Sequence, residues 1–504
     1  MKKLITSIAL ISFFSNNAMA GNFTILAADN PNSAQQTLSA DGDTGTIDEG
    51  AVFNFSGSGT PAINVRAASG TVTIINNGSV TIGGSANFVE SDTTLIINTT
   101  NNGSINSSSS AFLIRLNNNS SFTNSATGTI TTTGSGSPII NGNSAGGTTI
   151  TNAGTISGSA DSVIAIHMYS GTSVTNSGTI SLTGANSRTI FNLSQGGVLI
   201  NTGTISATGS NSFAIKGDFS SVTLGNDSTI TGNVEVGIAG GGAVNEVTIS
   251  GDNSTITGNI DFFDGNDSLA ISGNNSTITG TVDLGTGNDT MTISGNNSTI
   301  TGNVDLGTGD DAVTISGNSS TITGNVNLGA GNDAMALSGN DTTITVDVNL
   351  GDGDDSFTIS GNNSTIGGNI DFGAGDDTFT ISANKNSSFT GTIDLGAGTD
   401  TVNVSVASGR STRFFLPLDN VENFNVTTDA LHVVTAENTI YTIDPTGFTA
   451  MTIAANNLSK TVSDQVNSRL SLTDNESSRS KGKVWTKYFN SSFARGAEQQ
   501  NLAG

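Results

Sequence analysis

Between about residues 254 and 401, hydrophobic and polar positions return in the same order at a fixed spacing. The unit reads approximately S-T-I-T-G-N-V-D-L-G-x-G-N-D-x-φ-T-I-S-G-N-N, where φ is apolar, and it recurs six times with few changes. A fixed period of this size indicates one supersecondary unit stacked on copies of itself. The unit's aspartate returns every 22 residues, and a looser copy places Asp400 one residue late. The regularly spaced aspartates are Asp267, Asp289, Asp311, Asp333, Asp355 and Asp377.

Within each copy, apolar residues alternate with polar ones. Val282 and Leu284 flank Asp283, and Met291 and Ile293 are likewise two residues apart. This spacing predicts strands with one buried face, and no part of the unit keeps apolar residues at helical spacing. Glycine, asparagine and aspartate fill the gaps, where corners require positive φ. Three short strands and three corners therefore predict one coil of a right-handed parallel β-helix, an all-β fold.

Stacking turns each aligned position into a column with about 4.8 Å between coils. The threonines are expected to face water. One interior column is predicted at Ile256, Ile278, Ile300, Ile322, Ile344, Ile366 and Phe389. One corner is predicted to carry a structural ladder of side-chain amides at Asn274, Asn296, Asn318, Asn340, Asn362 and Asn384.

A looser repeat precedes these units, from residue 21 to about residue 223. The phrase N-x-G-x-I/V recurs there, for example at Asn76–Val80 and Asn201–Ile205, with its glycines 24 to 26 residues apart. We interpret it as the same kind of coil with longer corners. The prediction is one continuous solenoid, with coils of about 25 residues over 21–225 and of 22 residues over 226–401.

Residues 1–20 have the pattern of a Sec signal peptide. Lys2 and Lys3 form a positive start, an apolar run follows, and an A-x-A site ending at Ala20 precedes Gly21. The apolar run is too short to span a membrane, so we expect cleavage between Ala20 and Gly21 and export from the cytoplasm.

The period breaks after residue 401. Residues 402–448 include strand-like segments at 421–426 and 439–443, and a solenoid needs an atypical terminal unit to cover its open end. In the following linker, 449–482, apolar residues step by four over 451–472, which predicts a short C-terminal helix. The last segment, 483–504, contains a strand-like aromatic run at 484–489.

Composition narrows the functional classes. Of 504 residues, 34% are hydrophobic, 11% are charged and 64 are glycine, which suits a repetitive solenoid better than a compact α/β enzyme. The net charge of −25 argues against a nucleic acid or an anionic membrane surface as partner. The chain has no cysteine, which suits an exported protein that crosses a second barrier unfolded.

Five segments follow one another along the chain: the signal peptide, the N-S-G-T-I coils, the L-G-x-G-N-D units, the V-E-N-F-N-V segment and the helix after Asp444–Phe448. This order resembles a bacterial autotransporter of the type V secretion pathway. Lys483–Ala494 is similar to the opening strand of that family's outer-membrane β-barrel. The resemblance implies a passenger over 21–448, exported to the cell surface, with 402–448 starting its folding and the helix plugging the barrel pore. A barrel needs at least eight strands, so the translocator is expected to be absent from this chain through truncation, a frameshift or separate encoding.

The units are also similar to the haemolysin-type calcium-binding repeat, G-G-x-G-x-D-x-φ-x. Leu284–Met291 matches all of it but the first glycine, although that family places two nonapeptides in each turn and this chain only one. Calcium would neutralise stacked carboxylates that otherwise repel one another. The alternative is that each aspartate caps backbone N–H groups in a solvated corner, which is the outcome we expect. The calcium candidates are Asp267, Asp289, Asp311, Asp333, Asp355 and Asp377, and no other cofactor is predicted.

Neither histidine has the neighbouring residues that catalysis requires. His167 and His432 lie on separate predicted strands, without a nucleophile or metal-ligand neighbours in sequence. We therefore expect no enzyme activity. The leading interpretation is a structural or adhesive surface fibre whose partners are host or neighbouring-cell surface molecules or polysaccharide, besides a translocator barrel. The alternatives are a calcium-stabilised secreted binding module and a polysaccharide-acting enzyme on a β-helix.

Overall fold

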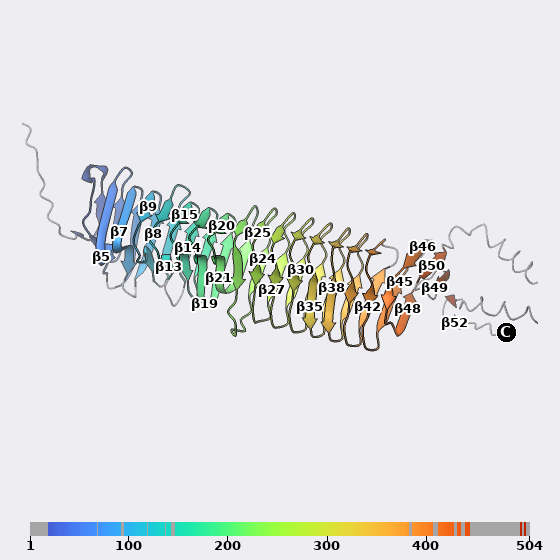
Figure 1. Ribbon diagram of the computed structural model, residues 1–504. Helices are drawn as coiled ribbons and strands as arrows, with labels where there is room; N and C mark the ends of the chain where they lie inside the picture. Colours follow the sequence, from blue (N-terminus) through green and yellow to red (C-terminus); the bar gives the residue numbers. More distant parts are fainter. Residues whose placement is uncertain are drawn as a thin grey trace, which may run out of the picture. The chain divides into compact units, whose positions relative to one another are not determined.

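The computed structural model is an all-β parallel solenoid of about 16 turns, in which strands stack coil upon coil (Figure 1). The only helical segment within its described residues is the short 3-10 turn Ala27–Asp29, and none of those residues form a helix suited in length and apolarity to cross a membrane. The predicted helix over 451–472 and the aromatic strand over 484–489 lie outside the described residues. The structure describes residues 19–67, 69–91, 95–117, 119–136, 138–142, 147–382, 386–406, 412–427, 431–434, 439–443, 494–495 and 498–499.

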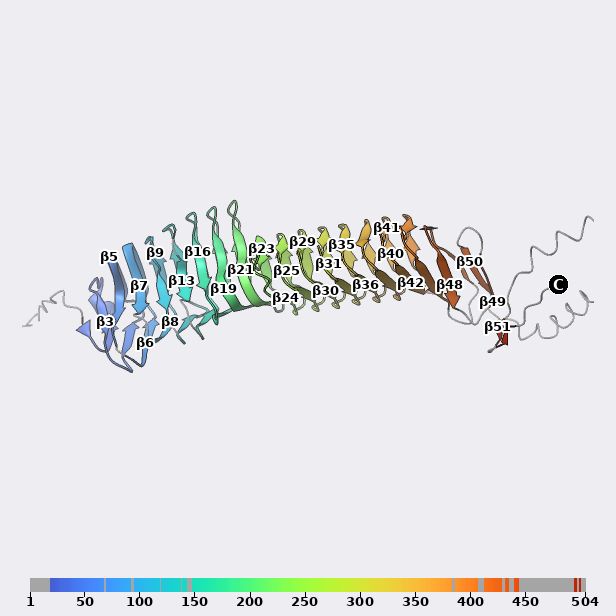
Figure 2. The same ribbon diagram turned by 90° about the horizontal axis from the view of Figure 1, so that it is seen from below.

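The chain divides into two compact units, Met1–Gly309 and Asp310–Gly504. We refer to them as the first and second units and describe each by itself. Figure 2 shows the parallel strands of each unit from a second direction.

Each regular coil contains three short strands, as predicted. In one coil of the first unit these are β28 (Thr277–Thr279), β29 (Val282–Asp283) and β30 (Thr290–Ile293). Each strand pairs in parallel and in register with the equivalent strand of the preceding coil. The solenoid therefore has three faces, which we name the hydroxyl face (the β28 column), the acidic face (the β29 column) and the third face (the β30 column).

The interior of each unit is built from the apolar columns predicted from the alternation, except that Phe389, predicted to end the isoleucine column, is only half-buried. Ile278 and Ile300 of the first unit are completely buried, as are Ile322 and Ile344 of the second, where the two are paired in register. The threonines on either side of these isoleucines are half-buried or exposed. The register of the strands was therefore predicted correctly, because a shift of one residue would turn every apolar side chain outward.

The loose and the regular repeats share the same faces. On the hydroxyl face, β20 (Thr204–Ala207) pairs with β22 (Thr229–Thr231), and β22 pairs with β25 (Thr255–Thr257). The pairing stays in register while the step between coils falls from 26 residues, as between Asn226 and Asp252, to 22 residues, as between Asp252 and Asn274. Corners absorb the difference in length, which confirms that both repeats form the same kind of coil.

Parallel pairing in the second unit continues beyond the regular repeats. β45 (Thr401–Ser405) pairs in parallel with β48 (Asn423–Thr427). A small antiparallel sheet follows, in which β50 (Thr439–Ile443) lies between β46 (Thr412–Phe415) and β49 (Leu431–Val434). Strands were predicted at both 421–426 and 439–443, and the antiparallel sheet is the atypical unit expected after the coils.

Short strands are also present near both ends of the described chain. β1 (Met19–Ala20) pairs in parallel with β3 (Gln36–Leu38), so the predicted cleavage point after Ala20 lies at the end of a strand. β51 (Ala494–Arg495) and β52 (Glu498–Gln499) form an antiparallel pair within the segment predicted to begin a barrel.

Candidate functional site

The predicted aspartates lie at the corner that precedes the third face of each coil, and they point inward. Asp289 comes two residues before the buried Met291, so the two side chains share the interior side of the chain. Their exposed fractions are at most 2%. The expectation of a solvated corner was therefore wrong, because the alternation that buries Met291 begins at the aspartate. We name this set the buried aspartate column: Asp267 and Asp289 in the first unit, and Asp311, Asp333, Asp355, Asp377 and Asp400 in the second.

Carboxylates of the column cap a backbone N–H of the coil before them, as is seen for Asp267, Asp289, Asp333, Asp355, Asp377 and Asp400. The N–H of Asp333 donates to Oδ1 of Asp355 over 2.7 Å, and that of Asp355 donates to Oδ1 of Asp377 over 2.7 Å. In the first unit the N–H of Asp267 donates to Oδ1 of Asp289 over 2.6 Å. The capping role expected of the aspartates is confirmed.

Two further residues complete the column where the regular repeat ends. Asn245 donates its N–H to Oδ1 of Asp267 over 2.7 Å, and Asp400 donates its N–H to Oε2 of Glu422 over 2.9 Å. Sequence reasoning missed both. A signal existed for Glu422, which follows Asp400 by the same 22 residues that separate the regular aspartates.

A second column of acceptors lies one residue earlier and caps in the opposite direction. In the second unit, Oδ1 of Asp354 accepts the N–H of Asp376 in the following coil over 2.8 Å, and Asp376 accepts the N–H of Thr399 over 2.8 Å. These side chains are exposed. Adjacent residues at one corner thus bind in opposite directions, one side chain buried and the other in solvent, so that the corner is closed without a regular strand.

The second carboxylate oxygen is where the buried column departs from ordinary capping. Oδ2 is buried and accepts no hydrogen bond in Asp267, Asp333, Asp355, Asp377 and Asp400. Burial raises the pKa to about 7 for Asp267 and Asp355, and to about 6 for Asp377. The bond from the backbone N–H lowers the pKa in part, while neighbouring carboxylates raise it further.

The residues of the column do not converge as calcium ligands do. Calcium takes 6–8 oxygens, usually including several carboxylates. Within the described residues, no three acidic, histidine or cysteine side chains are grouped closely enough to hold a metal ion. One oxygen of the carboxylates of Asp267, Asp289, Asp333, Asp355, Asp377 and Asp400 already binds a backbone N–H. The donor set therefore fits capping and does not fit a calcium site built from side chains.

Asparagine ladders occupy other corners. The predicted amide ladder is present in both units, at an exposed corner: Nδ2 of Asn296 donates to Oδ1 of Asn274 over 2.9 Å, and Nδ2 of Asn340 donates to Oδ1 of Asn318 over 2.9 Å. Asn384, predicted to end the ladder, lies outside the described residues.

A second asparagine ladder, which sequence reasoning missed, is completely buried in the first unit. Each Nδ2 except that of the last asparagine, Asn201, donates to Oδ1 of the next coil over 2.7–2.8 Å. The signal was the first letter of the N-x-G-x-I phrase. After the last asparagine the same column continues with Leu224 and Ile249, so the regular repeat replaces amides by apolar side chains. The ladder comprises Asn76, Asn101, Asn124, Asn152, Asn176 and Asn201.

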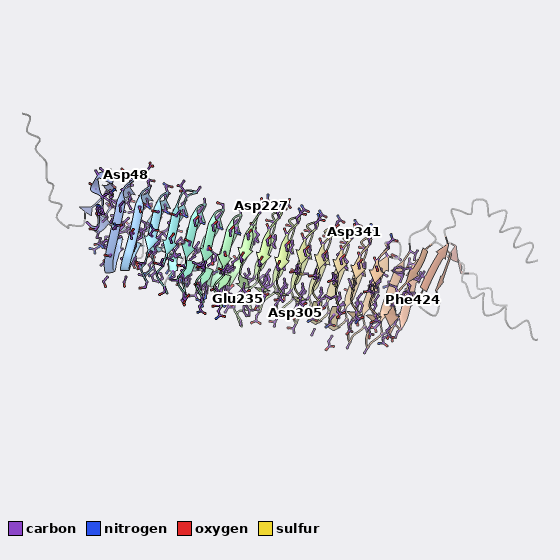
Figure 3. The ribbon with its side chains drawn as sticks, turned by 45° about the horizontal axis from the view of Figure 1, so that its top comes forward. Asp48, Asp227, Glu235, Asp305, Asp341 and Phe424 are labelled. Carbon is purple, nitrogen blue, oxygen red and sulfur yellow. The ribbon has the colours of Figure 1, made fainter. Side chains whose placement is uncertain are left out.

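The acidic face of the first unit carries a ladder of charges. The side chains are in register from one coil to the next, and the Lys216 ammonium bonds the Glu235 carboxylate at the head of the series. Figure 3 shows Glu235 and Asp305 along one side of this unit. The pKa of Asp283 is raised by burial and by Asp305, because like charges meet on adjacent strands. We name this series the charged ladder: Lys216, Glu235, Asp261, Asp283 and Asp305.

His167 lies in β16 (Ile164–Met168). The residues in register with it in the next two coils are Phe191 and Lys216, so this position carries aromatic and basic side chains. Its ring stacks on Phe191 at 5.0 Å between centroids, and the Arg188 guanidinium lies over the same phenyl ring. Burial and Arg188 lower the pKa of His167 to about 4. The ring is therefore neutral at pH 7, which fits packing rather than acid–base chemistry. His432 lies on β49, paired with Thr442.

Two surface hollows are lined mainly by polar side chains. One, in the first unit, has a volume of ≈ 650 Å³ and is lined by Asp48, Glu49, Asn77, Asn102 and Thr127. The other, of ≈ 490 Å³, is lined by Asn325, Val326, Asn327, Asp347, Val348, Asn349, Asn369 and Asp371 in the second unit. Their linings repeat from coil to coil, so both are parts of the regular surface.

No protein-family model matches this chain, and no curated protein matches its sequence.

Proposed function

We propose that this chain is the passenger of a bacterial autotransporter, displayed at the cell surface or released from it, and that it acts as a structural or adhesive fibre without catalytic activity. The fold supports a passenger of this kind, since an all-β parallel solenoid is what the resemblance implies. Its partners would be surface molecules or polysaccharides of a host or neighbouring cell.

The observation that carries the proposal is the continuity of the hydroxyl face in the first unit. One threonine column is unbroken from coil to coil, and each threonine is followed two residues later by a second hydroxyl side chain. A repeating surface suits a repeating partner, because each coil offers the same contacts as its neighbours. The column comprises Thr129, Thr155, Thr179, Thr204, Thr229, Thr255, Thr277 and Thr299.

Localisation is tested on intact cells of the source bacterium. Antibody against the first unit should label unpermeabilised cells or the culture supernatant, and external protease should remove the cell-bound signal while sparing a cytoplasmic marker. A chain protected from protease in intact cells and absent from the supernatant contradicts the proposal.

Adhesion is tested with the purified mature chain on host cells and on immobilised polysaccharides. Thr229→Lys with Thr255→Lys should reduce binding because long charged side chains would cover the hydroxyl face. The matched control is Thr248→Lys with Thr292→Lys, which alters the third face of the same unit. Equal loss in both double variants assigns no role to the hydroxyl face, and turnover of a polysaccharide by the chain contradicts a non-catalytic fibre.

A further inference from the structure

The buried aspartate column holds carboxylate oxygens that bind no protein donor. In Asp355 and Asp377, Oδ1 accepts a backbone N–H of the preceding coil, while Oδ2 is buried and accepts no hydrogen bond. Both side chains are at least 98% buried. A buried carboxylate with an unsatisfied oxygen is costly when charged, because it has lost the water that stabilised it. A ligand that satisfies Oδ2 must therefore be small enough to reach a closed corner.

The charged groups that act on this column are themselves acidic. Asp355 faces Asp333, Asp377 and the exposed Asp354 of the neighbouring column, and Asp377 faces Asp354, Asp376 and Asp400. Asp400 faces Glu422 and Asp376, and Asp333 faces Asp310. In the first unit, Asp267 faces Asp289, Asp218 and Asp264. Each of these neighbours disfavours a second negative charge at the corner.

We propose that the ligand of the buried aspartate column is the proton, so that mild acid loads the column and strengthens the stacking of the coils. A proton from solvent bonds to a carboxylate oxygen, the negative charge disappears, and Oδ1 keeps its bond to the backbone N–H. The proposal is independent of the adhesive function. It concerns the condition under which the solenoid is most stable.

The direction of the pH dependence follows from the two states. In the folded chain the pKa of Asp267 and Asp355 is about 7, and that of Asp289 and Asp377 about 6, raised mainly by burial. In the unfolded chain each returns to about 4. Between these values the folded state binds more protons than the unfolded state, so stability falls as the pH rises from about 4 to above 7. Within each unit the neighbouring carboxylates interact, so they titrate as a coupled group over a broad range.

The experiment compares thermal unfolding of the full chain by circular dichroism at pH 5 and pH 8, at constant ionic strength. The midpoint should be several degrees higher at pH 5. Asp355→Asn with Asp377→Asn should raise the midpoint at pH 8 and shrink the difference between the two pH values, because asparagine keeps the acceptor oxygen and carries no charge. The matched control, Asp354→Asn with Asp376→Asn, changes the adjacent exposed acceptors and should retain most of the difference.

Infrared spectroscopy of the folded chain provides a readout that does not depend on unfolding. A protonated carboxyl stretch should be present near pH 6, where exposed carboxylates are ionised, and it should weaken in the Asp355→Asn, Asp377→Asn variant but not in the control. If that variant fails to fold, the wild-type titration of this band decides alone. The proposal is overturned by a midpoint that is equal or lower at pH 5, by absence of the band, or by stabilisation at pH 8 with millimolar calcium that magnesium does not reproduce.

Discussion

The backbone N–H of Asp333 donates to Oδ1 of Asp355 in the next coil over 2.7 Å, although both side chains are buried. An N–H at this corner has no strand partner, so a side chain must satisfy it. A bond from N–H to a carboxylate is stronger than one between neutral groups, but burying the charge is costly. The carboxylate of Asp355 therefore satisfies the N–H at this corner, but the burial of its charge makes the stability of the corner depend on pH.

The interior register can be tested at neighbouring positions of one strand. Ile322 is completely buried in the native chain. Ile322→Asp should therefore lower the free energy of unfolding by several kcal/mol, since it buries a carboxylate without a partner. Thr321→Asp, on the outward side, should be nearly neutral. Chemical denaturation of both variants measures the difference, and equal losses would mean that the register is wrong by one residue.

The buried asparagine ladder should contribute to stability through its continuity. Asn152→Ala removes the acceptor of Asn124 Nδ2 and the donor of Asn176 Oδ1. Asn124 Nδ2 keeps its bonds to the carbonyl oxygens of Gly128 and Thr155, whereas Asn176 Oδ1 loses its donor. We expect a loss of roughly 1–3 kcal/mol for this buried acceptor left without a bond, measured by urea unfolding. Asn102→Ala, which removes one bond to Asn77 on the partly exposed surface, is the control and should cost about 1 kcal/mol or less. A similar cost at both positions would show that burial adds nothing to the ladder.

Some glycines are required because coils approach one another closely. At Gly287, φ is +136°, and a Cβ would lie 1.5 Å from the carbonyl oxygen of Gly265 in the preceding coil. Gly287→Ala should therefore displace the backbone and lower the thermal midpoint strongly. At Gly136, φ is +87° and a Cβ would meet no atom within 4 Å, so Gly136→Ala should cost only about 1–2 kcal/mol of backbone strain. Equal shifts in midpoint would contradict close approach as the cause.

The charged ladder predicts a stabilising substitution. Asp283 is paired in register with Asp261 on one side and Asp305 on the other. Asp283→Asn should stabilise the chain at pH 7 by roughly 0.2–1 kcal/mol, because it removes like charges on adjacent strands. The gain should shrink as salt is added, since exposed charges are screened. Denaturation at low and high salt measures it, and a loss of stability at low salt would contradict repulsion within the ladder.

The amino terminus of the mature protein tests export. Cleavage after Ala20 should leave Gly21 as the first residue of material recovered from the cell surface or supernatant. N-terminal sequencing of that material is the measurement. A different start, or a retained leader, would remove the signal peptide as the basis for localisation.

The sequence alone determined the repeating coil. Alternation every second residue places Ile322 and Ile344 inside, and a constant 22-residue step makes their pairing in register the simplest arrangement. It also determined the exposed amide ladder, because identical side chains at equal spacing must stack. These features follow from local pattern and period, and no knowledge of distant contacts is required for them.

Other features were decided only by the tertiary structure. Alternation from Met291 could have indicated that Asp289 faces inward, but which backbone N–H its carboxylate caps depends on how one coil lies over the next. The antiparallel sheet of β46, β50 and β49 follows no period, so its pairing could not be derived from spacing.

The physical reason is that the number of residues between contacting side chains differs from coil to coil. In the charged ladder Lys216 binds Glu235 across 19 residues, while at another corner the N–H of Asn274 binds Asp252 across 22. Where coils differ in length, packing of the buried side chains sets the register and the corners absorb the surplus residues. Packing of the core therefore determines which outward-facing residues become neighbours, and their separation along the chain does not reveal these pairs.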